Sequence, residues 1–283
     1  PPSVPQPVPT HAARFAKVDW PRFATPEIRC PVGEADNARL DACEAATLDS
    51  IRAHAEANPD TMAAIIMEPI QGEGGDNHFR DSFLRDMRSV CDEVGALYIF
   101  DEVQTGMGAT GRMWAHQHSS VEPDMIAFGK KSQGCGVMAG PRRKEFDDNV
   151  FATSSRINST WGGNLTDFVR ARLILETIER DDLVKNAEVV GAELIAGLNE
   201  FGTSHEMVSS VRGRGLFAAF TLPSHDIRNR FNSACLEAGM HVLNSGTQSI
   251  RLRPSLTFSS DEVNEGLNIL ESVANSIESS AVV

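Results

Sequence analysis

Acidic and amine side chains follow three short apolar segments of this sequence. Glu68 comes directly after MAAIIM, Asp101 comes directly after LYIF, and Lys130 follows MIAF after a single glycine. Short segments that are apolar throughout are typical of strands covered on both faces, as in a parallel sheet. Ligands of such sheets bind beyond the carboxyl ends of the strands. Asp101 and Lys130 are therefore expected to face each other across one crevice.

A carboxylate facing a lysine suits the chemistry of pyridoxal phosphate. This cofactor needs an amine that bonds to its aldehyde and a carboxylate that keeps its ring nitrogen protonated. Taken alone, an acid after a strand is more often a turn or helix cap, and a lysine there is more often a solvated surface residue. The two residues together favour the cofactor-binding interpretation.

Two adjacent lysines end the segment PDMIAFGKK. Neighbouring residues that leave a strand point in different directions, so only one of them can face the crevice. The spacing from Asp101 and from Pro123 assigns this role to Lys130. Lys131 is expected to turn away and to supply positive charge nearby.

The elements that would position these residues alternate between helix and strand, which indicates an α/β fold. A short helical turn is predicted near residues 113–118, and the segment 164–201 is predicted to be helical with a break near Asp181-Asp182. The other predicted helices are 38–57, 79–94, 225–238 and 260–279, and the predicted strands are 62–67, 97–100, 125–128, 136–140, 215–222, 240–244 and 249–256.

Two domains are expected. Residues 1–180 would belong to a large domain with a mostly parallel sheet and would include the bridging helix. Residues 181–283 would form a smaller α+β domain. A chain of 283 residues is long enough to bury a substantial core in this arrangement.

Composition narrows the range of partners. The chain has 26 Lys and Arg against 39 Asp and Glu, a formal net charge of −13, which disfavours binding to nucleic acid or to anionic membranes. No apolar segment approaches the roughly 20 residues of a spanning helix, so a cytoplasmic location is expected. The five cysteines have no CxxC spacing, and no metal site or disulfide framework is predicted. The start at PPSVPQPVPT, without a methionine, suggests the middle of a longer protein.

Two of these segments resemble the signature of a known family. IFDEVQTGMGATGRMWA and PDMIAFGKK are similar to the class III pyridoxal-phosphate aminotransferases, and EPIQGEGG, NSTWGGN and IRLRPSL resemble family segments in the same order. The resemblance extends over nearly all of the chain. It implies the fold type I of pyridoxal-phosphate-dependent transferases, and a homodimer whose active site is shared between subunits.

The resemblance also implies roles for individual residues. Lys130 matches the Schiff-base lysine, and Asp101 matches the acid that pairs with the pyridine nitrogen. Val103 would pack against the ring face and Gln104 would donate toward its phenolic oxygen. Thr160 would bind the phosphate of the cofactor held by the neighbouring subunit.

A substrate-binding pair is implied by two further matches, Glu73 in the glycine-rich loop and Arg251 near the C-terminus. An arginine can hold the distal carboxylate of 2-oxoglutarate through two parallel hydrogen bonds. Glu73 could mask this arginine when the other substrate enters. A permanent surface ion pair, worth about 0–1 kcal/mol, is the alternative.

Within the family, KKSQGCGVMAG and NSTWGGNLTDFVRARLILETIE are most similar to the L-lysine 6-aminotransferases. These enzymes transfer the ε-amino group of L-lysine to 2-oxoglutarate, giving glutamate and 2-aminoadipate 6-semialdehyde. Ornithine, 4-aminobutyrate or another ω-amine is the alternative substrate, and a non-catalytic fragment is the alternative outside enzymology. The family's phosphate-binding helix start, its ring-covering aromatic residue and an arginine for the substrate α-carboxylate are expected to lie upstream of this sequence.

Structural roles are predicted for other polar residues. His116 and His118 are two positions apart, so they would not share a helix face as metal ligands. The segment GEGG lacks the lysine of a nucleotide-binding P-loop. Arg212 and Arg214 in VRGRG are expected to serve strand entry and surface charge.

Overall fold

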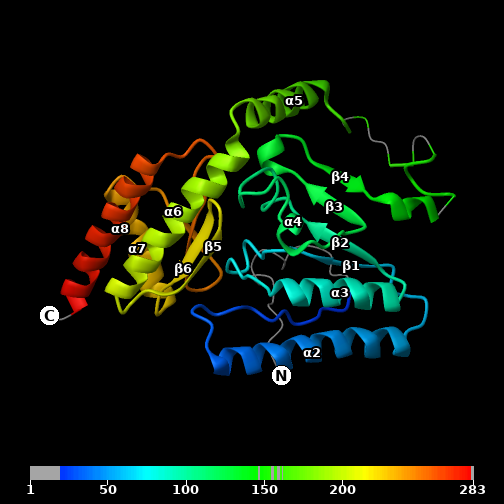
Figure 1. The fold of residues 1–283 in the computed structure, drawn as a ribbon, viewed down its shortest axis with the longest axis horizontal. Helices are drawn as coiled ribbons and strands as arrows, with labels where there is room; N and C mark the ends of the chain where they lie inside the picture. The colour runs from blue at the N-terminus through cyan, green and yellow to red at the C-terminus, as the bar shows by residue number, and fades with distance from the viewer. Residues whose placement is uncertain (1–19, 146, 154–155, 158–159, 161, 282–283) are drawn as a thin grey trace.

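The structure is a computed structural model that describes residues 20–281 except 146, 154–155, 158–159 and 161. Two four-stranded sheets form its framework. They lie beside each other along the long axis of the molecule, and each has helices on its outer side (Figure 1).

The first sheet has the strand order β1-β2-β3-β4. β1 (Ala64–Met67), β2 (Leu97–Asp101) and β3 (Met125–Phe128) are parallel, and β4 (Gly136–Ala139) pairs antiparallel with β3. Met67 pairs with Phe100, and Asp101 pairs with Ala127. The carboxyl ends of the three parallel strands therefore meet at one edge of the sheet.

Two helices, α2 (Glu34–Ala57) and α3 (Asp81–Glu93), lie along one side of this sheet (Figure 1). α3 has a strongly amphipathic sequence, with apolar residues at helical spacing on the side that faces the sheet. Its buried residues pack with Tyr98 and Phe100 of β2 in one hydrophobic cluster. This packing anchors β2, and with it the position of Asp101. A short helix, α4 (His116–Ser119), follows β2.

The second sheet is antiparallel throughout, with the order β5-β6-β8-β7. Its strands are β5 (Ser209–Arg214), β6 (Phe217–Thr221), β7 (Leu243–Ser245) and β8 (Ser249–Leu252). The helices that pack with it are α6 (Leu183–Ser204), α7 (His225–Glu237) and α8 (Ser260–Ala281). Their buried faces share the larger hydrophobic core of the protein.

The long helical segment between the sheets consists of α5 (Leu165–Arg180) and α6. α5 ends at Arg180 with Asp181 as its C-cap, and Asp182 has φ 48°, a left-handed conformation that a continuous α-helix does not contain. α5 also contacts η1 (Lys130–Ser132), a 3-10 turn after β3, and η2 (Pro141–Glu145) follows β4.

Most predicted elements are confirmed within a few residues, including the break at Asp181-Asp182. The predicted strand 240–244 was placed too early, since β7 is Leu243–Ser245, and the strand 249–256 ends at Leu252. The strand β5 was missed because VRGRG has neither an apolar run nor a regular alternation. The division into domains 1–180 and 181–283 stays a prediction.

Candidate active site

Glu68, Asp101 and Lys130 lie at the same edge of the first sheet. Glu68 directly follows Met67, whose partner Phe100 directly precedes Asp101, so the two acids are level in the sheet. Burial raises the pKa of Glu68, and the charge of Asp101 raises it further. The hydrogen bond from the Gly72 N–H and the charge of Lys130 act in the opposite direction. Both charged groups are thus close enough to Glu68 to influence its protonation.

Lys130 has a strained backbone, and its amine has no bonding partner within the described residues. Its φ of 53° lies in the left-handed region, which costs a non-glycine residue of the order of 1 kcal/mol or more and occurs often at active sites. The residue is exposed. Its ammonium makes no hydrogen bond or ion pair with any residue that the structure describes.

Lys131 differs sharply from its neighbour. Its ammonium donates to the main-chain oxygen of Gln104 at 2.5 Å and to that of Gly106 at 3.4 Å. Burial lowers the pKa of Lys131 to about 8, and the charges of Arg253 and Lys130 lower it as well. The ammonium of Lys131 is therefore hydrogen-bonded to the turn after β2.

Three residues predicted to face the cofactor lie at the end of β2 and in the turn that follows it: Asp101, Val103 and Gln104. Oδ1 of Asp101 accepts a hydrogen bond from the Val103 N–H at 3.0 Å, and Oδ2 has no hydrogen-bond partner within the described residues. The side-chain amide of Gln104 lies against Gly72, where an added Cβ would overlap it. Glycine at position 72 leaves space for this amide, which makes no hydrogen bond within the described part of the chain.

Glu102 was not predicted to have a role, although it adjoins Asp101. Its side chain is buried and accepts hydrogen bonds from the N–H groups of Ala115, at 2.5 Å, and His116, at 3.0 Å. The His116 ring also contacts it at 2.9 Å. A carboxylate at a helix N-terminus is favourable, so Glu102 closes the loop between β2 and α4. The acid followed by a short helical segment was the signal for it in the sequence.

Glu73 and Arg251 lie together. Nη1 of Arg251 is 2.8 Å from Oε2 of Glu73, and the exposed fractions of the two side chains are 12% and 70%. Nη1 and Nε of Arg251 are nevertheless buried without a hydrogen-bond partner. The contact is an ion pair rather than an aligned hydrogen bond, and it leaves donors of Arg251 available.

Four arginines in β5, in β8 and directly after β8 contact the segment 73–81, which leads from β1 to the start of α3. We name this set the arginine clasp: Arg212, Arg214, Arg251 and Arg253. The prediction of surface roles was wrong for Arg212, which is buried and donates to the main-chain oxygens of Gly75 and Asp76. It was also wrong for Arg214, which is half-buried and binds Asp81 at 2.9 Å. Sequence spacing gives no sign of these partners, because they lie more than a hundred residues away in the chain.

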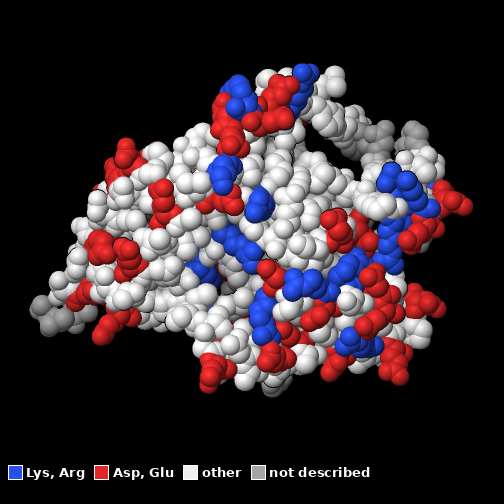
Figure 2. All heavy atoms as spheres, in the orientation of Figure 1, with Lys and Arg blue, Asp and Glu red and all other residues white. Residues whose placement is uncertain are grey.

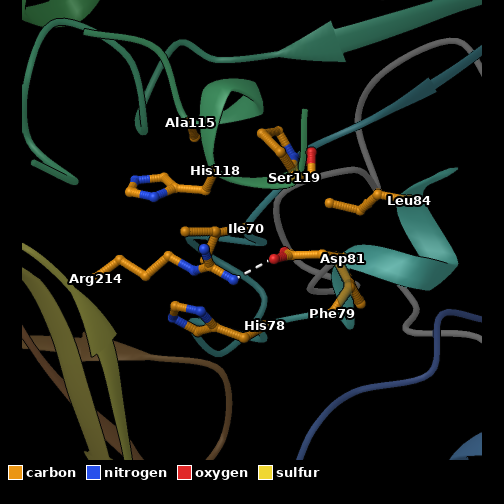
Figure 3. A pocket seen from close by; sticks show the side chains of 10 residues that line it. Ile70, His78, Phe79, Asp81, Leu84, Ala115, His118, Ser119 and Arg214 are labelled. Carbon is orange, nitrogen blue, oxygen red and sulfur yellow. Dashed lines mark hydrogen bonds and ion pairs between the residues drawn. The ribbon is translucent and has the colours of Figure 1, made fainter. Parts of the chain in front are cut away.

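A small cavity of about 10 Å³ adjoins the arginine clasp (Figure 3). Arg214 reaches across it from β5 to Asp81, while His78 and His118 lie on opposite sides of the arginine. Burial lowers the pKa of His78 to about 3, and Arg214 and Arg212 lower it further, so its ring is neutral. The cavity has room for about one water molecule, so it is too small to be a substrate pocket.

Basic side chains gather near this junction of the two sheets and over α3, whereas acidic side chains are spread over the outer helices (Figure 2). No group of three or more His, Cys, Asp or Glu residues that could hold a metal ion occurs in the described chain. Among the described helices, none combines the length and the apolar character that crossing a membrane requires.

Thr160 has no contact with the other predicted site residues among the hydrogen bonds and ion pairs of the described chain. It is exposed in the segment between η2 and α5 and has no hydrogen bond or ion pair with the rest of the described structure. Its neighbours at positions 158, 159 and 161 lie outside the described residues.

Comparison with known proteins identifies close relatives. L-lysine-epsilon aminotransferase of Mycobacterium tuberculosis is 49% identical over 265 residues, 93% of this chain and 58% of that protein. The enzyme of the same name from Streptomyces clavuligerus is 43% identical and covers 96% of this chain and 60% of its own. The chain thus spans somewhat more than half the length of these relatives.

More distant relatives include mitochondrial 4-aminobutyrate aminotransferase of Sus scrofa, which is 33% identical over 93% of this chain and 54% of its own. A solved structure, lysine aminotransferase from M. tuberculosis in the internal aldimine form, superposes with a TM-score of 0.91 at 47% identity, over 95% of this chain and 61% of that one. This likeness establishes the fold type I predicted for the chain. Residues 8–274 match the aminotransferase class-III family. Because of this family match and these relatives, the chain belongs to the class III aminotransferases, a family that depends on pyridoxal phosphate.

Proposed function

We propose that the protein, with pyridoxal phosphate, transfers the ε-amino group of L-lysine to 2-oxoglutarate, giving glutamate and 2-aminoadipate 6-semialdehyde. The observation that carries the proposal is the uncommitted amine of Lys130, on a strained turn at the sheet edge that also holds Asp101. The choice of lysine rests on the names of relatives at 49% and 43% identity, against 33% for a 4-aminobutyrate enzyme.

The residues at the sheet edge fit the needs of the cofactor. Among the described residues, the amine of Lys130, one carboxylate oxygen of Asp101 and the side-chain amide of Gln104 have no hydrogen-bond partner. When bound, pyridoxal phosphate supplies an electron sink for a carbanion at the substrate carbon. Asp101 would hold the proton of the ring nitrogen, and Val103 and Gln104 would orient the ring.

Lys130 would have two tasks. Its amine would first anchor the cofactor covalently and then give way to the amine of the substrate. The freed amine would remain beside the substrate carbon, where it can take a proton and return it. The amine is exposed and has no partner in the part of the chain that the structure describes, which suits both tasks.

Glu73 and Arg251 would adapt the site to two unlike substrates. With Glu73 moved aside, the free donors of Arg251 could bind the distal carboxylate of 2-oxoglutarate or glutamate. With Glu73 in place, the arginine charge is compensated while lysine is bound. The exposure of Glu73 permits such movement, since few neighbours restrain its side chain.

We further propose a homodimer in which Thr160 binds the phosphate of the cofactor in the partner. α5, next to the Thr160 segment, exposes several large apolar side chains: Leu165, Phe168, Val169 and Leu173. Monomers rarely expose contiguous apolar surface of this kind, whereas interfaces between subunits use it.

Borohydride trapping tests the proposed chemistry. Reduction of the full-length protein with bound cofactor should leave a phosphopyridoxyl group on the peptide that contains Lys130, which adds the cofactor mass less one water plus two hydrogens. Lys130→Ala should lose both this added mass and the visible absorbance. Lys144→Ala removes an exposed lysine elsewhere and is the control. Trapping on a different lysine would contradict the assignment.

The same preparation tests the substrate. Addition of L-lysine in a single turnover should remove the visible absorbance faster than ornithine or 4-aminobutyrate at equal concentration. If lysine shows no preference, the class of reaction stands but the choice of lysine is wrong.

A further inference from the structure

We propose that Lys131 is a positioning residue whose ammonium, bonded to the main-chain oxygens of Gln104 and Gly106, holds the turn after β2 in the shape that cofactor binding requires. The inference rests on the proposed function, because it concerns the residues that would meet the cofactor. It assigns different tasks to two adjacent lysines, one that bonds to the cofactor and one that shapes its site.

The turn is held at two points. At one end, the buried carboxylate of Glu102 binds the N–H groups of Ala115 and His116. At the other end, the ammonium of Lys131 binds Gln104 O and Gly106 O. No other donor within the described residues binds these two oxygens. Within the described residues, loss of Lys131 would leave Gln104 O and Gly106 O without a hydrogen-bond donor, although the Thr105 hydroxyl between them would still donate to Glu102.

The tether also links the two parts of the proposed site. Lys131 belongs to η1, directly after Lys130, so its hydrogen bonds connect the turn that carries Gln104 to the turn that carries the reactive amine. A displacement of the order of 1 Å at such a site can reduce activity a hundredfold. The two hydrogen bonds of Lys131 oppose such a displacement of one turn relative to the other.

The charge of Lys131 is costly to keep. The charged groups that face it are Arg253 after β8, Lys130 in η1 and Glu102 after β2, two cations and one anion. Burial is the largest cause of its lowered pKa of about 8, and only Glu102 opposes the decrease. The pKa of Lys131 in the folded protein lies below the ordinary value of 10.5. At neutral pH the charged ammonium therefore lowers the free energy of unfolding. An apolar side chain of similar length would avoid this cost, which argues that the ammonium serves more than packing.

The experiment compares cofactor affinity with stability in Lys131→Met, which keeps the length of the side chain but has no charge and no donor. Hydrogen bonds from a charged group are worth about 1.5–3 kcal/mol, so we expect pyridoxal phosphate to bind about tenfold or more weakly than to wild type at pH 7. At pH 9.5 wild-type Lys131 is mostly neutral, and the ratio of the two affinities should shrink. The thermal unfolding midpoint without cofactor should be unchanged or higher.

Two further variants complete the test. Lys144→Met, at an exposed site, should match wild type at both pH values. Lys131→Arg keeps its charge at pH 9.5, so its affinity relative to wild type should rise between pH 7 and pH 9.5. This comparison remains informative even if Lys131→Met does not fold.

Three outcomes would overturn the inference. Lys131→Met could bind pyridoxal phosphate as tightly as wild type at pH 7. The ratio of the affinities of Lys131→Met and wild type, or of Lys131→Arg and wild type, could stay the same between pH 7 and pH 9.5. Failure of wild type to bind pyridoxal phosphate would instead reject the proposed function. The two failures are therefore distinguishable.

Discussion

At the scale of single residues, buried charge is concentrated where the glycine-rich loop meets the second sheet. Asp76 is 1% exposed and pairs with Arg253. Burial raises the pKa of Asp76 to about 6, against the opposing effect of Arg253, and burial lowers the pKa of Arg253 to about 10. Both groups are thus ionised at pH 7 and compensate each other in a poorly solvated place.

We predict that Arg253→Ala destabilises the protein by about 3–5 kcal/mol, because it leaves the buried carboxylate of Asp76 without its main cation. The variant also removes a guanidinium whose Cζ lies 3.2 Å from the centre of the Phe217 ring. Urea unfolding at pH 7 measures the effect. Arg230→Ala, at an exposed position of α7, is the control and should change stability by less than about 0.5 kcal/mol.

A double variant sharpens this prediction. Adding Asp76→Ala to Arg253→Ala removes the uncompensated carboxylate, so the double variant should lose less stability than the sum of the two single variants. Strict additivity would show that the pair is not coupled.

At the scale of elements, His205 links the end of α6 to the C-terminal helix α8. Its Nδ1 lies 2.9 Å from Oε2 of Glu278, and its Nε2 lies 2.7 Å from Oε2 of Glu271. Burial lowers the pKa of His205, but the hydrogen bonds with Glu271 and Glu278 outweigh it, and the net pKa is raised. Two carboxylates on opposite sides of the ring favour the imidazolium, which has a donor on each side.

The raised pKa determines the sign of a pH effect. The contribution of His205 to stability should be fully present below the unfolded pKa of about 6.5 and should be lost as the pH rises through the folded pKa. We therefore expect His205→Gln to destabilise the protein by about 1–3 kcal/mol at pH 6 and by less at pH 9. Calorimetry at the two pH values measures this.

The exposed His225 of α7 is the matched control, and His225→Gln should show no comparable difference between the two pH values. An effect of His205→Gln that grows from pH 6 to pH 9 would contradict the predicted sign.

At the scale of the whole molecule, α5 exposes an apolar face that we expect a second subunit to bury. Its exposed fractions are 80% for Leu165, 60% for Phe168 and 56% for Leu173. We expect Phe168→Glu to convert the proposed homodimer to monomers, because a carboxylate buried at an interface without a partner is strongly unfavourable. Light scattering coupled to gel filtration measures the mass in solution.

Ala196→Glu adds the same charge at an exposed position of α6 and should leave the mass unchanged. A wild-type protein that is monomeric at micromolar concentration would contradict the dimer itself. A dimer that persists in Phe168→Glu would place the interface elsewhere.

Much of the fold was predictable because local patterns encode it. The helix α3 has apolar residues at helical spacing, and β3 is an uninterrupted apolar segment that matches its prediction. β5 was missed for the opposite reason, since its residues other than Val211 are polar or glycine, and the strand is held by pairing with β6 and by the buried guanidinium of Arg212. Such stabilisation comes from tertiary contacts, which no short segment of sequence displays.

The sequence by itself determined the parallel sheet, the edge at which Asp101 and Lys130 lie, and the family, because these depend on periodicity, strand ends and short motifs. Only the tertiary structure decided what the ammonium of the second lysine binds. Residue spacing shows that Lys131 follows Lys130, but not that the ammonium of Lys131 reaches two main-chain oxygens of another turn. Main-chain oxygens are present at every residue, so their selection depends on how the chain folds back on itself rather than on residue type.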